Sequence, residues 1–586
     1  MKTPKEEYPL YAVPNVRQFQ DILRHGMEHH PDRLALADLS ETPIAQVSYR
    51  QLFGHVLRFG RALLDAGCAR RDHVAIIAEN RVQWGIAYLA VTSFDMVAVP
   101  IDRNLQENEI LTILHASRAR VAIFSESFRD MFGTFQRSVR DLEILVDMDL
   151  PARRGTLHAM KEMMDMQDSA ARVSTARDSA LDGEGLPTID PDALSVLVFT
   201  SGSMGRAKGV MLSQSAICAN LRGMLQMVEI RSDDRFLSVL PIHHTYECTC
   251  GFLCPLVAGA SAHYARSLKT VAEDMLRVRP TILLGVPLLF EKMYRRIMQA
   301  IAEKKLVAAV LRPLQALTGA LESLGVQGVR RKLFHEVHER FGGAIRILIA
   351  GGAAPDIEVS RGFRALGFSF LQGYGLTETS PILALNRLRK FKDEAAGLPL
   401  PGVTLRIDDP DGEGRGEILA SGPSLMLGYY RNAEATAEVL QDGWLRTGDF
   451  GSIDEDGFLH INGRKKNVII ARNGENVFPE EIEDEVNRIP LVLECVVYGK
   501  KDESGNESIA VMIVPEANLV YGIAESAGVE VTPAYVRELL QKEIRVLNRR
   551  LPVHKQIRSV EVKETEFEKT TTQKIKRYLV QGGSGD

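Results

Sequence analysis

The sequence is poor in the features that mark several classes of protein. It has only six cysteines in 586 residues, and its formal net charge is −5, with no excess of basic residues. So few cysteines cannot form a disulfide framework, and we expect reduced thiols in a reducing compartment. A chain without a basic excess is not expected to bind nucleic acid. Apolar residues make up 45% and charged residues 25% of the chain, which is typical of a globular protein.

Long apolar runs are also lacking. The nearest approach covers residues 84–101, but it contains Asp95 and Pro100 and is typical of a buried helix followed by a strand. The first residues are followed by no apolar segment of the signal-peptide kind. We therefore expect a cytoplasmic protein, with peripheral membrane contact left open. An amphipathic stretch at residues 306–324 predicts a surface helix packed on the core rather than a helix lying in a membrane.

The order of the apolar segments predicts an α/β protein. Short apolar runs alternate with helical periodicity over the first 170 residues, and a second region of this kind covers about residues 236–385. Between about residues 402 and 463, short β-like runs alternate with Asp-Gly turn signals, which predicts a small antiparallel part. Roughly two to four folding units are expected, because single cores stop growing at about 250–300 residues.

A glycine-rich loop follows the apolar strand predicted at residues 194–199. It reads TSGSMGRAKG over residues 200–209. Glycines let backbone N–H groups turn inward, while the hydroxyls and Lys208 add donors and positive charge, and these are the components of a phosphate site. The loop lacks both the Gly-Lys-Ser/Thr ending of a Walker loop and the Gly-x-Gly-x-x-Gly spacing of dinucleotide-binding proteins. Taken alone, it is also compatible with a plain Gly/Ser hairpin.

The loop resembles the first core motif of the adenylate-forming (AMP-binding) superfamily, which includes acyl-CoA synthetases, luciferases and the adenylation domains of peptide synthetases. That superfamily carries further motifs in a fixed order, and similar segments follow here in that order. They are LPIHHTY at 240–246, GGAAP at 351–355, QGYGLTET at 372–379, GEI to GYY at 416–430, GWLRTGD at 443–449, GRKK to PEEIE at 463–483 and KTTTQKI at 569–575. Each motif alone is a weak signal, whereas the ordered set is very specific.

The resemblance implies a division into two domains. The N-terminal domain, residues 1–465, would contain two packed α/β sheets and a small β subdomain at about residues 402–463. The C-terminal domain, residues 466–586, would be a small mobile α+β domain that rotates about a hinge at Lys466. Rotation about a few hinge torsions is a common way to present one site to two reactions.

The implied activity is a two-step ligase reaction. A carboxylate first attacks the α-phosphate of ATP and releases pyrophosphate, and the thiol of coenzyme A then converts the acyl-AMP to acyl-CoA and AMP. A carboxylate with a pKa near 4 is already ionised at pH 7, so no general base is needed. Catalysis must instead come from alignment and charge neutralisation. ATP, Mg²⁺ and coenzyme A are the implied cofactors, and small molecules are the expected partners.

Site residues are carried over from the superfamily motif by motif. The implied catalytic residues are Lys574, His244, Thr377 and Glu378, and Glu378 would also hold Mg²⁺. Lys574 would bridge the carboxylate and the negative charge that develops during adenylation, and His244 would lie beside the acyl carboxylate. The implied cofactor-binding residues are Thr200, Ser201, Gly202, Ser203 and Lys208 for the phosphates, Thr377 for the α-phosphate, Gly351 and Gly352 around the nucleotide, Tyr374 for adenine, Asp449 and Arg464 for the ribose, and Gly474 for the thiol tunnel.

Three positions depart from the usual superfamily pattern. Met204 stands where a hydroxyl residue is common, Ala207 replaces a proline before Lys208, and Gln573 replaces a glycine before Lys574. None of these changes removes a charged catalytic group. The third bears on the backbone path that delivers Lys574.

The motifs at residues 463–470 and 574–577 are most similar to those of bacterial long-chain fatty acyl-CoA synthetases, which favours a medium- or long-chain fatty acid as substrate. Superfamily members that act on acetate-sized acids carry a pocket-blocking tryptophan where this chain has Gly375, and the apolar stretch at residues 251–257 suits an alkyl chain. Three alternatives remain within the superfamily: an acyl-AMP ligase, an enzyme that acylates a carrier protein, and a CoA ligase for aryl or alicyclic acids. The first is disfavoured by the short path from Lys466 to Gly474, which has no obvious insertion.

Two other classes of function fit the sequence less well. A zinc site is suggested by five residues that crowd together, namely His243, His244, Cys248, Cys250 and Cys254. Their spacing does not match the usual Cys-x-x-Cys pattern, and we expect these cysteines to be buried apolar residues. A non-catalytic binding module is disfavoured because the charged and hydroxyl motif residues are intact, namely Lys208, Thr377, Glu378, Asp449 and Lys574.

Overall fold

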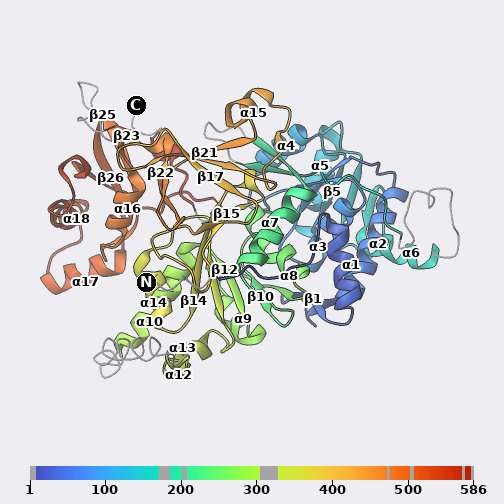
Figure 1. Ribbon diagram of the computed structural model, residues 1–586, viewed down its shortest axis with the longest axis horizontal. Helices are drawn as coiled ribbons and strands as arrows, with labels where there is room; N and C mark the ends of the chain where they lie inside the picture. Colours follow the sequence, from blue (N-terminus) through green and yellow to red (C-terminus); the bar gives the residue numbers. More distant parts are fainter. Residues whose placement is uncertain are drawn as a thin grey trace, which may run out of the picture. The chain divides into compact units, whose positions relative to one another are not determined.

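A computed structural model describes residues 8–170, 185–200, 208–303, 328–470, 476–501, 507–570 and 574–581 (Figure 1). The chain forms two compact units. The first contains Met1–Thr404 and Ala420–Leu445, and the second contains Leu405–Leu419 and Arg446–Asp586. These two units are defined by how the chain packs. The boundary predicted at residues 465 and 466 is that of a domain expected to rotate, and it stays a prediction. The amphipathic stretch at residues 306–324 lies outside the described residues.

One sheet of the first unit has eight strands in the order β19-β9-β8-β4-β3-β5-β6-β7. Neighbouring strands from β8 to β7 are parallel, and β9 and β19 are antiparallel to their neighbours. Parallel strands covered on both faces read as continuous apolar runs, which is why the sequence predicted several of them. The strands are β3 (His73–Ile77), β4 (Val97–Pro100), β5 (Val121–Phe124), β6 (Ile144–Asp147), β7 (Leu157–Ala159), β8 (Leu194–Thr200), β9 (Lys208–Ser213) and β19 (Gly428–Tyr429).

The other sheet has nine strands in the order β16-β15-β14-β13-β12-β10-β11-β1-β2. Neighbouring strands from β14 to β1 are parallel, and the edge strands β2, β15 and β16 are antiparallel. The strands are β1 (Leu34–Asp38), β2 (Ala45–Ser48), β10 (Arg235–Ser238), β11 (Ser261–Tyr264), β12 (Ile282–Gly285), β13 (Ile347–Ala350), β14 (Ser369–Gly375), β15 (Ile382–Leu385) and β16 (Leu398–Pro399). The predicted pair of α/β sheets is thereby confirmed.

Helix α3 (Val82–Ser93) connects the two sheets. It is buried at nearly every position and contacts strands of both sheets, while α1 and α2 pack beside it (Figure 1). The buried helix and strand predicted at residues 84–101 are therefore α3 and β4. The other helical segments of this unit are α1 (Phe19–His29), α2 (Tyr49–Asp65), α4 (Glu107–Ser117), η1 (Glu126–Phe128), α5 (Arg129–Ser138), α6 (Met160–Ala170), α7 (Gln214–Met227), η3 (Tyr246–Leu253), α8 (Cys254–Val257), α9 (Val271–Val278), α10 (Pro287–Glu303), α12 (Val329–Leu333), α13 (His335–Arg340), α14 (Ile357–Ala365), η4 (Thr377–Thr379) and α15 (Ala433–Val439).

The second unit is an α+β structure. A sheet in the order β17-β18-β21-β20, with β22 paired to β21, accounts for the β-rich part predicted at about residues 402–463, and the three-stranded sheet β25-β26-β27 follows later in the chain. The remaining elements of the chain, of which β20 belongs to the residues of the first unit, are β17 (Thr404–Asp408), β18 (Gly416–Ser421), β20 (Leu440–Gln441), β21 (Trp444–Ile453), β22 (Leu459–Arg464), η5 (Lys465–Asn467), β23 (Ile469–Ile470), β24 (Asn476–Val477), α16 (Pro479–Asn487), β25 (Val492–Lys501), β26 (Glu507–Pro515), α17 (Ala517–Ala527), α18 (Pro533–Asn548), η6 (Val553–Lys555), β27 (Ser559–Val562) and α19 (Tyr578–Gln581).

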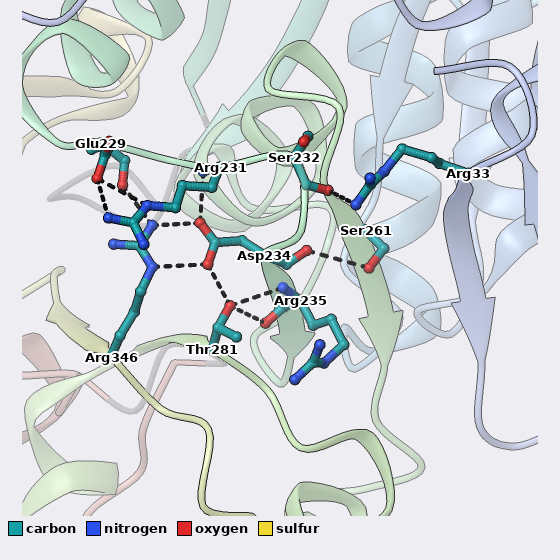
Figure 2. A network of polar contacts seen from close by, with 9 residues as sticks. All are labelled: Arg33, Glu229, Arg231, Ser232, Asp234, Arg235, Ser261, Thr281 and Arg346. Carbon is teal, nitrogen blue, oxygen red and sulfur yellow. Dashed lines mark hydrogen bonds and ion pairs between the residues drawn. The ribbon is translucent and has the colours of Figure 1, made fainter. Parts of the chain in front are cut away.

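A polar network ties together the amino ends of β10, β12 and β13 (Figure 2). Asp234 precedes β10, and its Oδ1 accepts hydrogen bonds from the Thr281 hydroxyl at 2.7 Å and from Arg346 Nε at 2.9 Å. Thr281 directly precedes β12, and Arg346 directly precedes β13. Burial alone would raise the pKa of Asp234, but the hydrogen bonds and charge of Arg346 and the N–H of Arg231 lower it below its usual range. The opposite ends of these strands carry the sequence motifs.

Replacing Asp234 with alanine should destabilise the protein by about 2–4 kcal/mol, because the largely buried Arg346 guanidinium loses its carboxylate partner. Thermal unfolding should show a lower Tm than for the control Asp233→Ala, which changes an exposed neighbour. Since the folded-state pKa of Asp234 is lowered, its contribution is present above pH 4 and is lost as pH falls through the folded pKa. Equal Tm values for the two variants at pH 7 would contradict this account of the network.

Candidate functional site

The motif residues of the first unit gather at the carboxyl ends of parallel strands. The LPIHHTY motif follows β10, Gly351 and Gly352 follow β13, and Tyr374 lies near the end of β14. The motif that contains Thr377 and Glu378 continues from β14 into η4. The carboxyl ends of parallel strands are where α/β proteins bind ligands. Motifs that are far apart in the sequence thus lie at the same edge of one sheet.

Three of these motifs are in direct contact. The Tyr246 hydroxyl donates to the Ile349 carbonyl at 3.2 Å, and the Thr245 and Thr377 hydroxyl oxygens are 3.4 Å apart. A Cβ added to Gly351 would lie 2.7 Å from the Tyr246 ring, so the motif glycine is required by close packing. The segment that carries the histidine pair is therefore held between the other two motifs.

The glycine-rich loop joins two paired strands, β8 and β9. Thr200 and Lys208 are partners at the last register position of this pair, and the Thr200 hydroxyl donates to the Lys208 carbonyl at 3.5 Å. The sequence prediction of a strand leading into the loop is confirmed. Ser201, Gly202 and Ser203 lie outside the described residues.

Tyr429 connects the loop to Glu378. Strand β19 pairs with β9, and the Lys208 ammonium lies 4.8 Å from the centre of the Tyr429 ring, which is a cation–π distance. The Tyr429 hydroxyl donates to Glu378 Oε1 at 2.9 Å, and the Met426 N–H donates to the Glu378 carbonyl at 2.8 Å. Sequence reasoning placed Tyr429 within a motif but missed this contact, because nothing in the local pattern shows which strand lies beside it.

Asn80 is a second residue that sequence reasoning missed. Its Nδ2 donates to the Leu240 carbonyl at 2.6 Å and to the Ser238 hydroxyl at 3.2 Å, and its Oδ1 accepts from the Ile242 N–H at 3.0 Å. It thereby fixes the backbone that leads to His244. The available signal was a polar residue at the carboxyl end of a buried parallel strand, β3.

The two adjacent histidines have different surroundings. His244 Nδ1 accepts a hydrogen bond from the Tyr246 N–H at 3.2 Å, so a neutral ring carries its proton on Nε2. His243 Nε2 lies 3.6 Å from Asp102 Oδ2. Burial lowers the pKa of His243, and the Asp102 carboxylate opposes this only in part. The resemblance assigned the site role to His244, and the Tyr246 N–H orients its ring.

Gly375 has a backbone reason to lack a side chain. A Cβ at this position would lie 1.8 Å from the Pro381 carbonyl oxygen. Any side chain here requires the β14–β15 segment to move, whatever the size of the acid pocket. The absence of tryptophan at Gly375 therefore follows from local packing and carries less information about the pocket than the sequence suggested.

Glu247 is a buried carboxyl that the sequence analysis did not single out. It is 1% exposed on the π-helical segment η3, and neither carboxyl oxygen has a hydrogen-bond partner among the described residues. Burial raises its pKa to about 8, and the nearby Ser238 hydroxyl lowers it only in part. The carboxyl is therefore largely protonated at neutral pH. The clue in the sequence was a lone acidic residue at the start of an otherwise apolar stretch.

Replacing Glu247 with glutamine should stabilise the protein more at pH 8 than at pH 5. The folded-state pKa is raised, so the wild type loses stability as pH rises between the unfolded value near 4.5 and about 8. Glutamine mimics the neutral form throughout, and the gain between the two pH values should be about 2–4 kcal/mol. Tm measured for both proteins at both pH values tests this, and a Tm difference independent of pH would contradict it.

In the second unit, Asp449 and Arg464 face each other across two paired strands. They are register partners on β21 and β22, and Arg464 Nε lies 2.7 Å from Asp449 Oδ1. Asp449 is buried, and the part of β21 just before it is fixed by Thr447, whose hydroxyl donates to the Ile418 carbonyl at 2.8 Å and accepts from the Asp449 N–H at 3.1 Å. The two residues assigned to the ribose by resemblance are thus brought together.

Two lysines of the second unit share this electrostatic environment. The pKa of Lys466, which lies on η5, is lowered by partial burial and by Arg464, with Asp449 acting in the opposite direction. The pKa of Lys574 is lowered by desolvation and by Arg464, again opposed by Asp449, although much of the residue is open to solvent. Lys574 therefore belongs to the same charged group as Asp449 and Arg464. Gln573 and Gly474 lie outside the described residues.

The crowded cysteines after the histidine pair are buried. Cys248, Cys250 and Cys254 are each 5% exposed, and burial raises the pKa of each thiol, so they are thiols at neutral pH. Among the described residues, no three or more His, Cys, Asp or Glu side chains are arranged to hold a metal ion. A Mg²⁺ ion needs fewer protein ligands, and a single carboxylate such as Glu378, beside bound phosphates, is a donor set that fits it.

No helix in the described part of the chain combines the length and apolar character needed to cross a bilayer.

The sequence matches the family of AMP-binding enzymes over residues 23–430 and the C-terminal domain of AMP-binding enzymes over residues 466–581. The chain belongs to the AMP-binding enzyme family. Family membership confirms the adenylate-forming class that the ordered motifs predicted. CoA ligases of this class use ATP, Mg²⁺ and coenzyme A, and the relatives of this AMP-binding enzyme support an acid–thiol ligase.

Two relatives and one solved structure illustrate the family. The long-chain-fatty-acid–CoA ligase FadD15 of Mycobacterium bovis is 28% identical over 506 residues, which are 83% of this chain and 81% of the relative. The chloroplastic long-chain-fatty-acid–[acyl-carrier-protein] ligase AEE15 of Arabidopsis thaliana is 26% identical over 595 residues, with 89% and 79% covered. ATP-bound MatB from Rhodopseudomonas palustris has the same fold, with a TM-score of 0.74, 24% identity, and coverage of 96% of this chain and 99% of MatB.

Proposed function

We propose that this AMP-binding enzyme is an ATP-dependent acyl-CoA ligase that acts on a medium- or long-chain fatty acid. The proposal is supported by two contacts of Tyr429, a cation–π contact with Lys208 and a hydrogen bond to Glu378. Together they join the glycine-rich loop to the Thr377-Glu378 motif. They put a fixed cation, a hydroxyl and a carboxylate at one edge of the fold. These are the groups that an ATP polyphosphate with its metal ion requires.

In the first step, an oxygen of the acid's carboxylate bonds to the α-phosphorus of ATP, and the bond to pyrophosphate breaks. We assign Lys208 and the loop residues Thr200, Ser201, Gly202 and Ser203 to the β- and γ-phosphates, and Thr377 to the α-phosphate. Glu378 would hold Mg²⁺, which would supply charge neutralisation when bound. No proton has to move, because the acid is ionised at pH 7.

The remaining site residues orient the two reactants. His244, whose ring is oriented by the Tyr246 N–H, would lie beside the acid's carboxylate. Tyr374 would stack on adenine next to Gly351 and Gly352, and Asp449 would accept from the ribose hydroxyls, with Arg464 beside it. Lys574 would neutralise the charge that develops between the carboxylate and the α-phosphate.

In the second step, the thiol of coenzyme A attacks the acyl carbon, AMP leaves, and the thiol proton goes to solvent or AMP. We propose that residues 466–586 rotate about Lys466 between the two steps, which removes Lys574 and brings Gly474 to the thiol. Support comes from the position of Lys466 in the short segment η5, between β22 and the strand pair β23–β24. A short connection of this kind can absorb a large torsional change.

The fatty-acid assignment rests on the similarity to FadD15, which is named as a long-chain-fatty-acid–CoA ligase. The stretch at residues 251–257, expected to suit an alkyl chain, is largely buried in the core, where Phe252 packs edge-on against Trp84 and Tyr88.

A second candidate acceptor is a carrier protein, favoured by the similarity to AEE15, which is named as a ligase for acyl-carrier-protein.

A screen of acids tests the substrate class. ATP–pyrophosphate exchange should be measured with straight-chain acids of graded length and with aromatic acids, and the best acid should then be supplied with either coenzyme A or a phosphopantetheinyl carrier protein. We expect exchange to be strongest with medium- or long-chain acids and the thioester to form with coenzyme A. Exchange only with aromatic acids, or thioester only on the carrier protein, would replace the proposed substrate or acceptor.

A further inference from the structure

Two chain segments beside Lys574 are held together, and we call residues 566–570 the incoming arm and residues 574–577 the outgoing arm. Lys569 and Ile575 form an isolated antiparallel bridge. The Thr570 N–H donates to the Lys574 carbonyl at 2.7 Å, and the Lys574 N–H donates to the Thr570 hydroxyl at 3.2 Å. Both backbone polar groups of Lys574 are therefore bonded to Thr570. This fixes the lysine backbone relative to the incoming arm.

The incoming arm is anchored by one carboxylate, that of Glu494 on β25. Its Oε2 lies 2.6 Å from Lys569 Nζ, and its Oε1 accepts from the Phe567 N–H at 2.7 Å. The Glu494 and Lys569 side chains are only 12% and 15% exposed. A charge-assisted pair this well shielded is stronger than a surface ion pair. Both oxygens of Glu494 are thus committed to holding the arm that pairs with Lys574.

The outgoing arm has a second anchor. Arg577 Nη2 pairs with the carboxylate of Glu483 on α16, and Arg577 Nη1 donates to the Val497 carbonyl at 3.2 Å. The Val497 N–H in turn donates to Glu483 Oε1 at 2.6 Å. Between the anchors, Ile575 packs against a small apolar cluster that contains Phe567. Lys574 therefore lies between two fixed points on neighbouring elements.

We propose that Glu494 is a positioning residue for adenylation, which acts through Lys569 and the incoming arm to hold Lys574 where the reaction needs it. The pair formed by Arg577 and Glu483 is the matching anchor on the other side. This inference rests on the proposed role of Lys574 in the first step. A lysine side chain has many rotamers, so a fixed backbone removes part of the disorder that would otherwise misplace its ammonium.

The competing explanation is that Glu494 only stabilises the second unit. The two explanations differ in which reaction step they affect. A general loss of stability lowers both half-reactions, whereas a misplaced Lys574 lowers only acyl-adenylate formation. They also differ in additivity, because a residue that acts through Lys574 adds no further loss once Lys574 has been removed.

The test compares Glu494→Ala with Glu566→Ala in the full-length protein. Glu566 is the exposed second partner of the same lysine, at 2.8 Å from Lys569 Nζ, and it is the matched control. ATP–pyrophosphate exchange reports the first step, and acyl-CoA formation from synthetic acyl-AMP reports the second. We expect Glu494→Ala to lower the exchange rate by about 10- to 100-fold, since displacements of about 1 Å have such effects. The thioester step and the control should stay within about twofold of wild type.

Two further variants complete the test. Glu494→Gln keeps an oxygen for the Phe567 N–H but loses the charge opposite Lys569, and it should give an intermediate loss of exchange. The double variant Glu494→Ala/Lys574→Ala should be no slower than Lys574→Ala alone. Equal losses in both half-reactions, or a further loss in the double variant, would overturn the positioning role. If Lys574→Ala itself leaves exchange intact, the proposed role of the lysine fails, which is a separate result.

Discussion

Replacing Lys574 with alanine should lower acyl-adenylate formation from acid and ATP by at least about 100-fold, the loss usual for one charged transition-state contact. The ammonium is proposed to face the oxygens that gain negative charge in the first step. The second step proceeds after the proposed rotation, when the lysine has left the reaction centre. Acyl-CoA formation from synthetic acyl-AMP should therefore stay within about threefold of wild type.

The control for this variant is Lys576→Ala, two residues further along the same arm. Lys576 makes a loose pair with Glu568 at 3.8 Å and has no proposed role in either step. Exchange assays and thioester assays on the same preparations should show that Lys576→Ala resembles the wild type in both. If Lys574→Ala lowered both steps equally, the lysine would be part of a shared framework and would have no specific role in adenylation.

Replacing Lys466 with proline should have the opposite pattern. The proline ring fixes φ near −65°, which suits the 3₁₀ conformation of η5 but blocks a large change of that torsion. We expect pyrophosphate exchange to remain largely intact and acyl-CoA formation to fall about 100-fold, which corresponds to a torsional penalty of about 3 kcal/mol. Pre-formed acyl-AMP should not rescue the defect, because the block lies in the rotation itself.

The matched control is Lys466→Ala, which removes the same ammonium but leaves φ free. It separates the torsion from the charge, and the charge is of interest because burial and Arg464 lower the pKa of Lys466. We expect Lys466→Ala to retain most of its thioester activity. A proline variant with unimpaired turnover to acyl-CoA would exclude Lys466 as the hinge and, with it, the domain boundary at residues 465 and 466.

Local patterns were enough to predict much of the fold. Strands covered on both faces, such as β3 and β5, read as apolar runs, and the strand before the glycine-rich loop ends at Thr200, one residue beyond the predicted end. The buried helix α3 was visible because it is apolar all around. In each case, the apolar pattern of consecutive residues is enough to predict the element.

Contacts between distant segments could not be predicted in this way. Tyr429 bonds to Glu378 across 51 residues, and Asn80 bonds to Leu240 across 160 residues. Such pairings depend on strand order, which no local pattern contains. Gly375 is another example. Its missing side chain suggested an open acid pocket, whereas the fold shows that the Pro381 carbonyl oxygen leaves no room for a Cβ there. Ordered motifs pointed to the residues of the site but not to what holds them.

The central claim is that this AMP-binding enzyme joins a fatty acid to coenzyme A through an acyl-AMP intermediate. The most direct measurement is the product balance of the wild-type enzyme with ATP, Mg²⁺, coenzyme A and the best acid from the screen. We expect equal amounts of acyl-CoA, AMP and pyrophosphate, with transient acyl-AMP and no ADP. ADP and phosphate as products, or acyl-AMP that accumulates without any thioester when coenzyme A is present, would contradict it.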